Sequence, residues 1–346
     1  MSLSNVQGEP NVVKNFAPSW FAAVMGTGIL ALTSLSYSQY VPFLKSAATL
    51  LFYFNVILFF VLLIPWTLRW VLYTKEALAD LEHPILSNFY ATIAIAMLVL
   101  SANFTIIEEN IFIGEIFWFV GTGLTIFFGI LSPFIMFKGE QVTMDHINPA
   151  WFIPPVGLIV IPIPGSFIID QYSGFIREIV IFLNYFGWGA GFFLYMALCA
   201  ICTHRFILHR PLPNVLAPTI WINLGPIGAG TVALINLVNH SAFITVREPF
   251  FVFGLIFWGF GIWWTVMAIA MTLYYMRKMK LPYALSWWAF TFPLGAYVAG
   301  SHSVATLFHL AIIDFIGFGL YLLLVFLWSL TLIKTSMAVY YGRLFT

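Results

Sequence analysis

Charged residues are scarce in this chain of 346 residues, since Asp, Glu, Lys and Arg together make up only 8% of it. Soluble domains carry about 25% of such residues, so this chain has too little charge to cover the surface of a water-soluble globule. The 14 basic and 13 acidic residues give a net charge of +1. This balance excludes the strongly basic surface of a nucleic-acid-binding protein, and we expect no nucleic-acid partner.

Cysteine and leader signals are also missing. Cys199 and Cys202 are the only cysteines, too few for a disulfide framework. Their C-x-x-C spacing has no second pair to complete a zinc site, and we interpret them as structural. The opening residues, MSLSNVQGEP, contain neither a basic segment nor a small-residue cleavage site, so we expect no signal peptide.

Catalytic motifs are absent as well. The sequence has no glycine-rich phosphate loop, no G-x-S-x-G, and no H-E-x-x-H among its seven histidines. No pair of carboxylates falls inside a hydrophobic stretch. We therefore expect no enzyme, no cofactor and no bound metal. An intramembrane enzyme is a remote alternative, because it would need several histidines or carboxylates at mid-membrane depth.

Long hydrophobic runs dominate what is present, and 62% of the residues are hydrophobic. A membrane-spanning helix needs roughly 20 mostly apolar residues. Ten stretches qualify: about Phe16–Ser34, Ser46–Tyr73, Pro84–Thr105, Ile111–Phe137, Asn148–Ile169, Glu178–Thr203, Asn214–Asn236, Pro249–Met276, Leu281–His302 and Phe308–Val339. We predict an all-α integral membrane protein whose ten helices form a single transmembrane domain over residues 1–346.

The basic residues predict the orientation of this bundle. Ten spans place eleven of the 14 Lys and Arg residues on the side that holds both termini, and only Lys45, Arg177 and Arg247 on the other. Positive residues accumulate on the cytoplasmic side. We therefore expect a cytoplasmic segment at 1–15, a bundle at about 16–339, a cytoplasmic tail at 340–346, and a location in the cell membrane.

Proline and glycine are concentrated in the odd-numbered stretches. Pro155, Pro226 and Pro293 lie inside the fifth, seventh and ninth, and Met25-Gly26-Thr27-Gly28 lies inside the first. An internal proline kinks a helix, and the freed carbonyls must then face protein or a water-filled cavity. We predict that the odd helices line a central cavity, with the third the least clear. Gly187-Trp188-Gly189-Ala190-Gly191 indicates a helix-packing face.

Polar side chains on these stretches are candidates for the cavity lining, although any one of them taken alone is better explained by an interhelical hydrogen bond. No Lys or Arg lies mid-span, so half-helix N-termini would have to attract an anion. The candidates are Ser19, Thr27, Asn88, Thr92, Ser101, Asn103, Asn223, Thr291, Ser301, His302 and Ser303.

The ends of the spans on the outer side carry a few titratable groups. Glu115 and Asp314 are either interfacial residues or proton-coupling carboxylates. His302 is a candidate pH-sensitive element or a solvated surface histidine. Asn236, Asn239 and His240 either form an outer vestibule or end a helix.

Three sequence strings resemble the tellurite-resistance/dicarboxylate transporter family, which includes TehA, fungal malate permeases, sulphite efflux pumps and plant slow anion channels. They are Asn15-Phe16-Ala17-Pro18-Ser19-Trp20-Phe21 with Met25-Gly26-Thr27-Gly28, Asn148-Pro149-Ala150-Trp151 with Pro154-Pro155-Val156-Gly157, and Trp287-Trp288-Ala289-Phe290-Thr291-Phe292-Pro293. The resemblance extends over essentially the whole chain.

The resemblance implies five helical hairpins, with odd helices around a pore, and a homotrimer with one pore per protomer. It also implies that Phe292, next to Pro293, plugs the pore. The implied function is transport of small anions, either malate-like C4-dicarboxylates or small inorganic anions. Sulphite or tellurite efflux is the alternative. The missing mid-span cation favours singly charged anions. A purely structural membrane protein would not need broken helices around a cavity.

Overall fold

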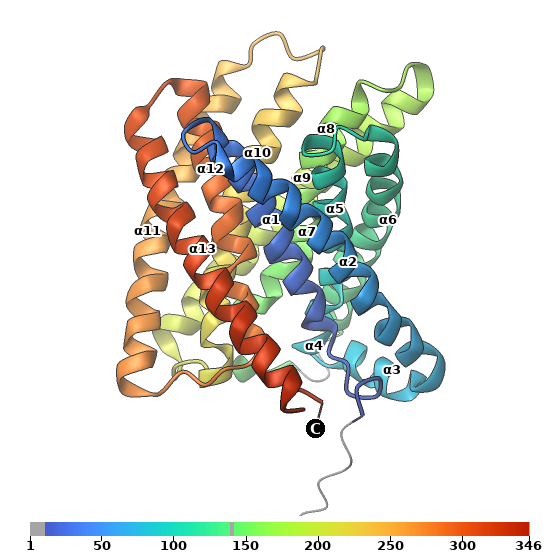
Figure 1. The fold of residues 1–346 in the computed structure, drawn as a ribbon, viewed down its shortest axis with the longest axis vertical. Coiled ribbons are helices and arrows are strands. Elements are labelled where there is room, and N and C mark those ends of the chain that lie inside the picture. Colours follow the sequence, from blue (N-terminus) through green and yellow to red (C-terminus); the bar gives the residue numbers. More distant parts are fainter. Residues whose placement is uncertain (1–10, 139–141, 346) are drawn as a thin grey trace, which may run out of the picture.

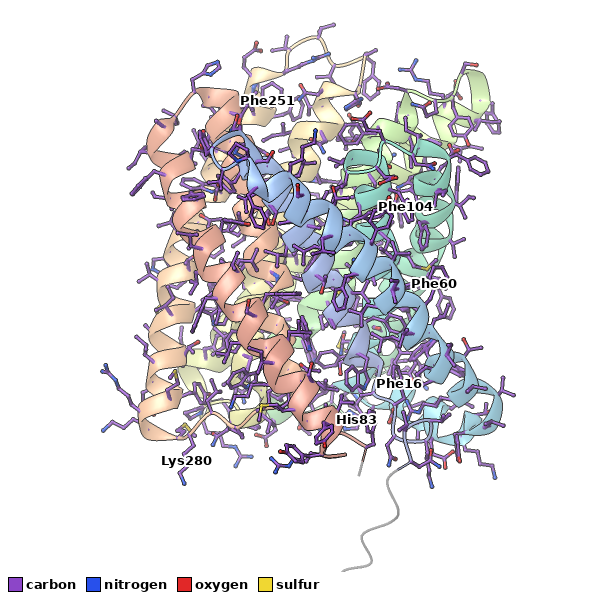
Figure 2. The ribbon with its side chains drawn as sticks, in the orientation of Figure 1. Phe16, Phe60, His83, Phe104, Phe251 and Lys280 are labelled. Atoms are coloured by element: carbon purple, nitrogen blue, oxygen red, sulfur yellow. The ribbon has the colours of Figure 1, made fainter. Side chains whose placement is uncertain are left out.

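The computed structural model describes residues 11–138 and 142–345, and its ordered elements are all helices within that part of the chain. Five long helices form the outside of the bundle: α2 (Phe43–Leu72), α6 (Ile111–Phe137), α9 (Gly174–Leu208), α11 (Glu248–Lys278) and α13 (Ala311–Tyr340). Only 22–39% of the residues in their most apolar stretches are buried. Their remaining side chains, such as Phe60 on α2, project outward (Figure 2) and match the apolar membrane interior.

The odd-numbered spans lie inside this layer and are interrupted near one end. Each has a short turn followed by a longer helix, except that the fifth is broken twice. The pairs are η1 (Pro18–Phe21) and α1 (Ala22–Ser36), α4 (Leu86–Phe89) and α5 (Ala91–Ile106), η4 (Pro149–Phe152) with α7 (Ile153–Val160) and α8 (Pro162–Ile169), η5 (Asn214–Asn223) and α10 (Leu224–Asn239), and η6 (Leu285–Phe290) and α12 (Phe292–Phe308).

These inner helices form a closed ring. α1 packs on α5, α5 on α7, α7 on α10, α10 on α12, and α12 on α1. Each also packs on the outer helix that follows it in the chain, which gives five hairpins (Figure 1). In four of the inner spans 72–89% of the most apolar stretch is buried. The third span, formed by α4 and α5, belongs to the ring as fully as the other four inner spans. The prediction that it is the least clear of the cavity-lining helices is therefore corrected.

The ten predicted stretches are all present within the described residues. Nine are helical stretches of at least 18 residues, some made of two or three consecutive helices, and the remaining one, the ninth along the chain, is formed by η6 and the 17-residue α12. The boundary predicted for this ninth span, Leu281–His302, is wrong. Residues 281–284 are not helical, and α12 continues to Phe308, where His309 adopts a left-handed conformation with φ 55° and ends it.

The two ends of the described chain meet at one end of the bundle. The amide of Asn11 donates to the carbonyl of Phe345 at 3.3 Å, and the rings of Trp20 and Phe345 stack. Lys280 lies at this same end and Phe251 at the opposite one (Figure 2). Short connections α3 (Thr74–Glu82) and η3 (Met144–His146) also lie at the end with the termini, whereas η2 (Tyr37–Gln39) lies at the other. This arrangement follows from an even number of spans.

Candidate functional site

Two cavities lie inside the ring of inner helices. The wider cavity lies away from the termini, and we call it the outer cavity. It has a volume of about 360 Å³ and is lined by residues of all five inner spans, for example Leu35, Ile106, Phe167, Asn236 and Ser303. The inner cavity, of about 40 Å³, lies toward the end that holds the termini, because residues of η1 and η6 line it. Its lining includes Ser19, Thr92, Ile153, Gly225 and Ser286. The two cavities therefore follow one another along the middle of the bundle.

Phe292 lies where the cavities meet. Among the described residues it is the only one that lines both, and its side chain is 5% exposed. It is the first residue of α12, and Pro293 beside it also lines the inner cavity. The ring of Phe292 thus separates a wide outer space from a narrow inner one.

The lining of both cavities is uncharged. Within the described residues it contains no Asp, Glu, Lys, Arg or His. Its polar side chains are Ser19, Thr92 and Ser286 in the inner cavity, and Ser36, Asn236 and Ser303 in the outer one. Any charged species inside would interact with hydroxyls, amides and backbone dipoles rather than with a fixed counter-charge.

The longer inner helices all begin around the inner cavity. The first or second residue of each one lines it: Ala22 of α1, Thr92 of α5, Ile153 of α7, Gly225 of α10 and Phe292 of α12. A helix N-terminus carries a partial positive charge of roughly half an elementary charge. The first turns of five α-helices surround one small space, an arrangement that would favour an anion there.

The prolines predicted to kink the pore helices have a different local role. Pro293 is the second residue of α12, Pro155 the third of α7, and Pro226 the third of α10. The first-turn amides of a helix have no partner within that helix, so proline fits there without breaking a bond. These prolines therefore lie in the first turns of α12, α7 and α10 and do not bend the middle of a continuous helix. The interruption in each of these spans lies just before its proline.

Ser19 and Thr92 are the predicted lining residues that the structure places on the inner cavity. Ser303 and Asn236, also singled out from the sequence, line the outer cavity. Ser36 was missed because it lies beyond the predicted stretch Phe16–Ser34. Ser286 was missed because it lies in the 3-10 turn η6, which the sequence pattern did not separate from the helix that follows.

Eight predicted residues line neither cavity: Thr27, Asn88, Ser101, Asn103, Asn223, Thr291, Ser301 and His302. Most of them use their polar groups in hydrogen bonds to other parts of the protein. Asn88 donates to the Pro84 carbonyl at 2.9 Å, and the Thr291 hydroxyl donates to the Trp288 carbonyl at 2.7 Å. Asn223 is fully buried, and both polar atoms of its side chain lack a hydrogen-bond partner among the described residues. Ser101, Asn103 and Ser301 form interhelical hydrogen bonds.

The Met25-Gly26-Thr27-Gly28 string is a packing centre for α1. A Cβ atom at Gly26 would lie 2.1 Å from Oγ1 of Thr291, so glycine is needed where α1 meets the break before α12. The carbonyl of Gly28 accepts from Nδ2 of Asn103 on α5 at 3.0 Å. The Thr27 hydroxyl accepts from Nε1 of Trp328 on α13 at 3.0 Å. The string therefore fixes the depth and rotation of α1.

Thr27→Val tests this packing role. The substitution leaves the partly buried Trp328 N–H without its acceptor, and an unpaired donor costs about 1–3 kcal/mol where it is fully buried. We expect a lower thermal unfolding temperature in detergent and unchanged ion flux in proteoliposomes, because Thr27 faces away from both cavities. A large change in flux with unchanged unfolding would instead place its hydroxyl in the path.

The titratable groups at the end of the bundle opposite the termini are paired with one another. His302 Nδ1 lies 3.0 Å from Oδ1 of Asp314, and Tyr40 donates to the other oxygen of that carboxylate. His240 Nδ1 contacts Asp170, and the ring of Phe167 packs on this histidine. Glu115 lines neither cavity, and its Oε1 is buried without a partner among the described residues.

Comparison with known proteins places the chain among membrane transporters. The family model SLAC1, described as voltage-dependent anion channel, matches residues 15–336. An uncharacterized transporter of Methanocaldococcus jannaschii is 61% identical, over 99% of each chain. A sulfite efflux pump of Arthroderma otae is 28% identical over 88% of this chain and 86% of the pump. A malic acid transport protein of Schizosaccharomyces pombe is 24% identical over 83% of this chain and 70% of that protein.

Proposed function

The chain belongs to the SLAC1 family of voltage-dependent anion channels, and from this premise we propose that it passes small anions through the two cavities, with Phe292 as the gate. The resemblance inferred from three sequence strings is confirmed by the family match. The observation that supports the pathway best is the convergence of five helix N-termini on an uncharged inner cavity. Positive dipole ends attract anions, whereas the lack of a fixed cation prevents tight binding.

The proposed substrates are singly charged or weakly bound anions, such as chloride, nitrate or the monoanion of a malate-like C4-dicarboxylate. A dianion in a low-dielectric span needs a fixed counter-charge, and the cavity lining offers none. Sulfite export is the second candidate, because the Arthroderma otae relative is a sulfite efflux pump. Tellurite efflux rests on the family resemblance alone. In each case the chain acts as a transporter and not as an enzyme.

We further propose a cell-membrane protein with both termini in the cytoplasm, assembled as a homotrimer. Eleven of the 14 basic residues favour this orientation. Each protomer holds a complete pair of cavities, so a trimer would contain three separate pathways. Cysteine accessibility near each terminus and native mass spectrometry test orientation and assembly.

A flux panel in proteoliposomes tests the proposed function. It compares malate, chloride, nitrate, sulfite and tellurite, with and without a proton gradient. We expect flux of several anions that is independent of the gradient, because no titratable side chain lines either cavity in the described chain. Malate uptake that requires the gradient would indicate a coupled carrier instead. The absence of flux above protein-free vesicles for all five would reject anion transport.

Ser19 provides the matched variants for this panel. Ser19→Asp places a carboxylate on the uncharged inner cavity, and like charges about 4 Å apart repel by roughly 4 kcal/mol even at an effective dielectric constant of 20. Ser19→Asn is the neutral control. We expect Ser19→Asp to lower every anion flux at least tenfold and Ser19→Asn to change it little. Equal fluxes would show that anions do not pass this cavity.

A further inference from the structure

A groove opens on the outside of the bundle between α9 and α11, at the end that holds the termini. It has a volume of about 470 Å³, and its lining includes Arg205, His209, Arg210, Trp264, Met271 and Tyr275. We call it the Arg205 groove. It is separate from the two central cavities, with which it shares no lining residue.

Arg205 is the unusual residue of this groove. Its side chain is 1% exposed, Nη1 donates to the carbonyl of Arg210 at 3.3 Å, and Nε is buried without an acceptor. No carboxylate pairs with it among the described residues. Arg69, the other arginine buried at this end, also has one donor, Nη1, without a partner, but its charge is paired with Asp80 at 2.6 Å. A buried guanidinium with an unused donor and no counter-charge indicates that an acceptor is supplied from outside the chain.

The charges around Arg205 leave it unneutralised. Asp145 is the nearby carboxylate, and it pairs with Arg210 at 2.9 Å and lies 3.7 Å from Nε2 of His209. The hydrogen bond from Arg210 lowers the pKa of Asp145 below its usual range, so this carboxylate stays ionised at neutral pH. The charges of Arg210 and Asp145 cancel each other, so the groove retains the positive charge of Arg205.

The position of the groove favours a lipid over a soluble anion. Its rim carries the exposed apolar side chains of Ile207, Trp263 and Met267, which lie on the membrane-facing helices α9 and α11. Arg205 lies in the last turn of α9, near the membrane surface, whereas Trp263 lies midway along α11, so the rim runs from that end toward the membrane interior. Basic pockets between helices at this depth suit acidic lipid headgroups, with the chains lying along the apolar rim.

We propose that the Arg205 groove binds the phosphate group of an anionic membrane lipid. Arginine is well suited to phosphate, because adjacent N–H donors on its planar guanidinium can bond two phosphate oxygens. Nε of Arg205 supplies one such donor, and Trp263 and Met267 contact the lipid chain. The bound lipid holds the ends of α9 and α11 together, independently of which anion the central path carries.

Native mass spectrometry of the purified full chain tests this proposal. Wild type is titrated with phosphatidylglycerol, phosphatidylcholine or inorganic phosphate. We expect one tightly retained phosphatidylglycerol per protomer, and a roughly tenfold weaker affinity in Arg205→Gln, as the loss of one charge-assisted hydrogen bond predicts. Arg177→Gln, at the opposite end of the same helix, is the matched control and should bind as wild type does.

A second variant keeps the result decisive if Arg205→Gln folds poorly. Met271→Trp fills the groove without removing its charge, and it should lose the retained lipid while unfolding near the wild-type temperature. Retention of phosphatidylglycerol by both variants would overturn the proposal. So would equal retention of phosphatidylcholine, or displacement of the lipid by millimolar phosphate. A change in the oligomeric state of either variant with an unchanged lipid count would show that the groove holds a second copy of the chain.

Discussion

Phe292→Ala is expected to raise anion flux in proteoliposomes by roughly tenfold, because removing a barrier of only about 1.4 kcal/mol already gives that factor. Phe292 is the side chain between the outer and inner cavities, and shortening it to a methyl group joins them. Helix α12 starts at this residue, and Pro293 needs no hydrogen bond there. The substitution should therefore leave the helix and the fold intact.

Phe290→Ala is the matched control for the gate. Phe290 lies two residues away, is 3% exposed, and packs on Trp221 and Trp287 instead of the cavities. Removing it creates a comparable space outside the path, so flux should stay near the wild-type value while stability falls. Unchanged flux in a folded Phe292→Ala protein, or equal increases in both variants, would remove Phe292 as the gate.

Gly228→Ala is expected to cause the largest loss of stability among single methyl additions to the inner ring. A Cβ atom at Gly228 would lie 2.3 Å from backbone atoms of Ala296 and Tyr297, where α10 crosses α12. Backbone cannot move aside as a flexible side chain can, and overpacking costs about 1–3 kcal/mol or more. The thermal unfolding temperature in detergent should drop by many degrees, and expression should fall with it.

Gly259→Ala on α11 separates this steric effect from the general effect of replacing glycine. A Cβ atom at Gly259 would meet nothing within 4 Å, and alanine is favoured over glycine inside a helix by about 1 kcal/mol. This control should be neutral or slightly more stable than wild type. If Gly228→Ala unfolds at the wild-type temperature, then α10 and α12 do not cross as closely as the structure has them.

Close contacts at glycine also show which packing faces of the helices could be predicted from the sequence. The pattern at Gly187 and Gly191 was interpreted as a packing face, and Cβ atoms there would lie 2.7 Å and 2.6 Å from carbonyls of Leu158 and Pro155. Small residues four apart form one face of a helix, so the sequence carries this information locally. What such a face packs against depends on residues distant in the chain and is not locally encoded.

The lining of the path was predictable only in part for the same reason. Ser19 and Thr92 line the inner cavity as expected, whereas the Thr27 hydroxyl accepts from Trp328 and the Asn88 amide donates to the Pro84 carbonyl. An inner helix of a membrane bundle is apolar on nearly every face, so it has no hydrophobic period to set its rotation. Its polar residues then look alike in the sequence.

The sequence by itself determined the number of spans, the location of both termini at the same end of the bundle, and which spans are broken. Hydrophobic length, the distribution of basic residues and the positions of proline indicate these features without knowledge of tertiary contacts. Only the tertiary structure decided that the prolines begin helices around one small cavity, and which polar side chains face it. It also placed Phe292, one of 37 phenylalanines, where the cavities meet. Contacts such as Gly26 with Thr291 and Gly228 with Ala296 fix the rotation and depth of each helix. Such contacts join segments far apart in the chain, and they form only when the ring closes.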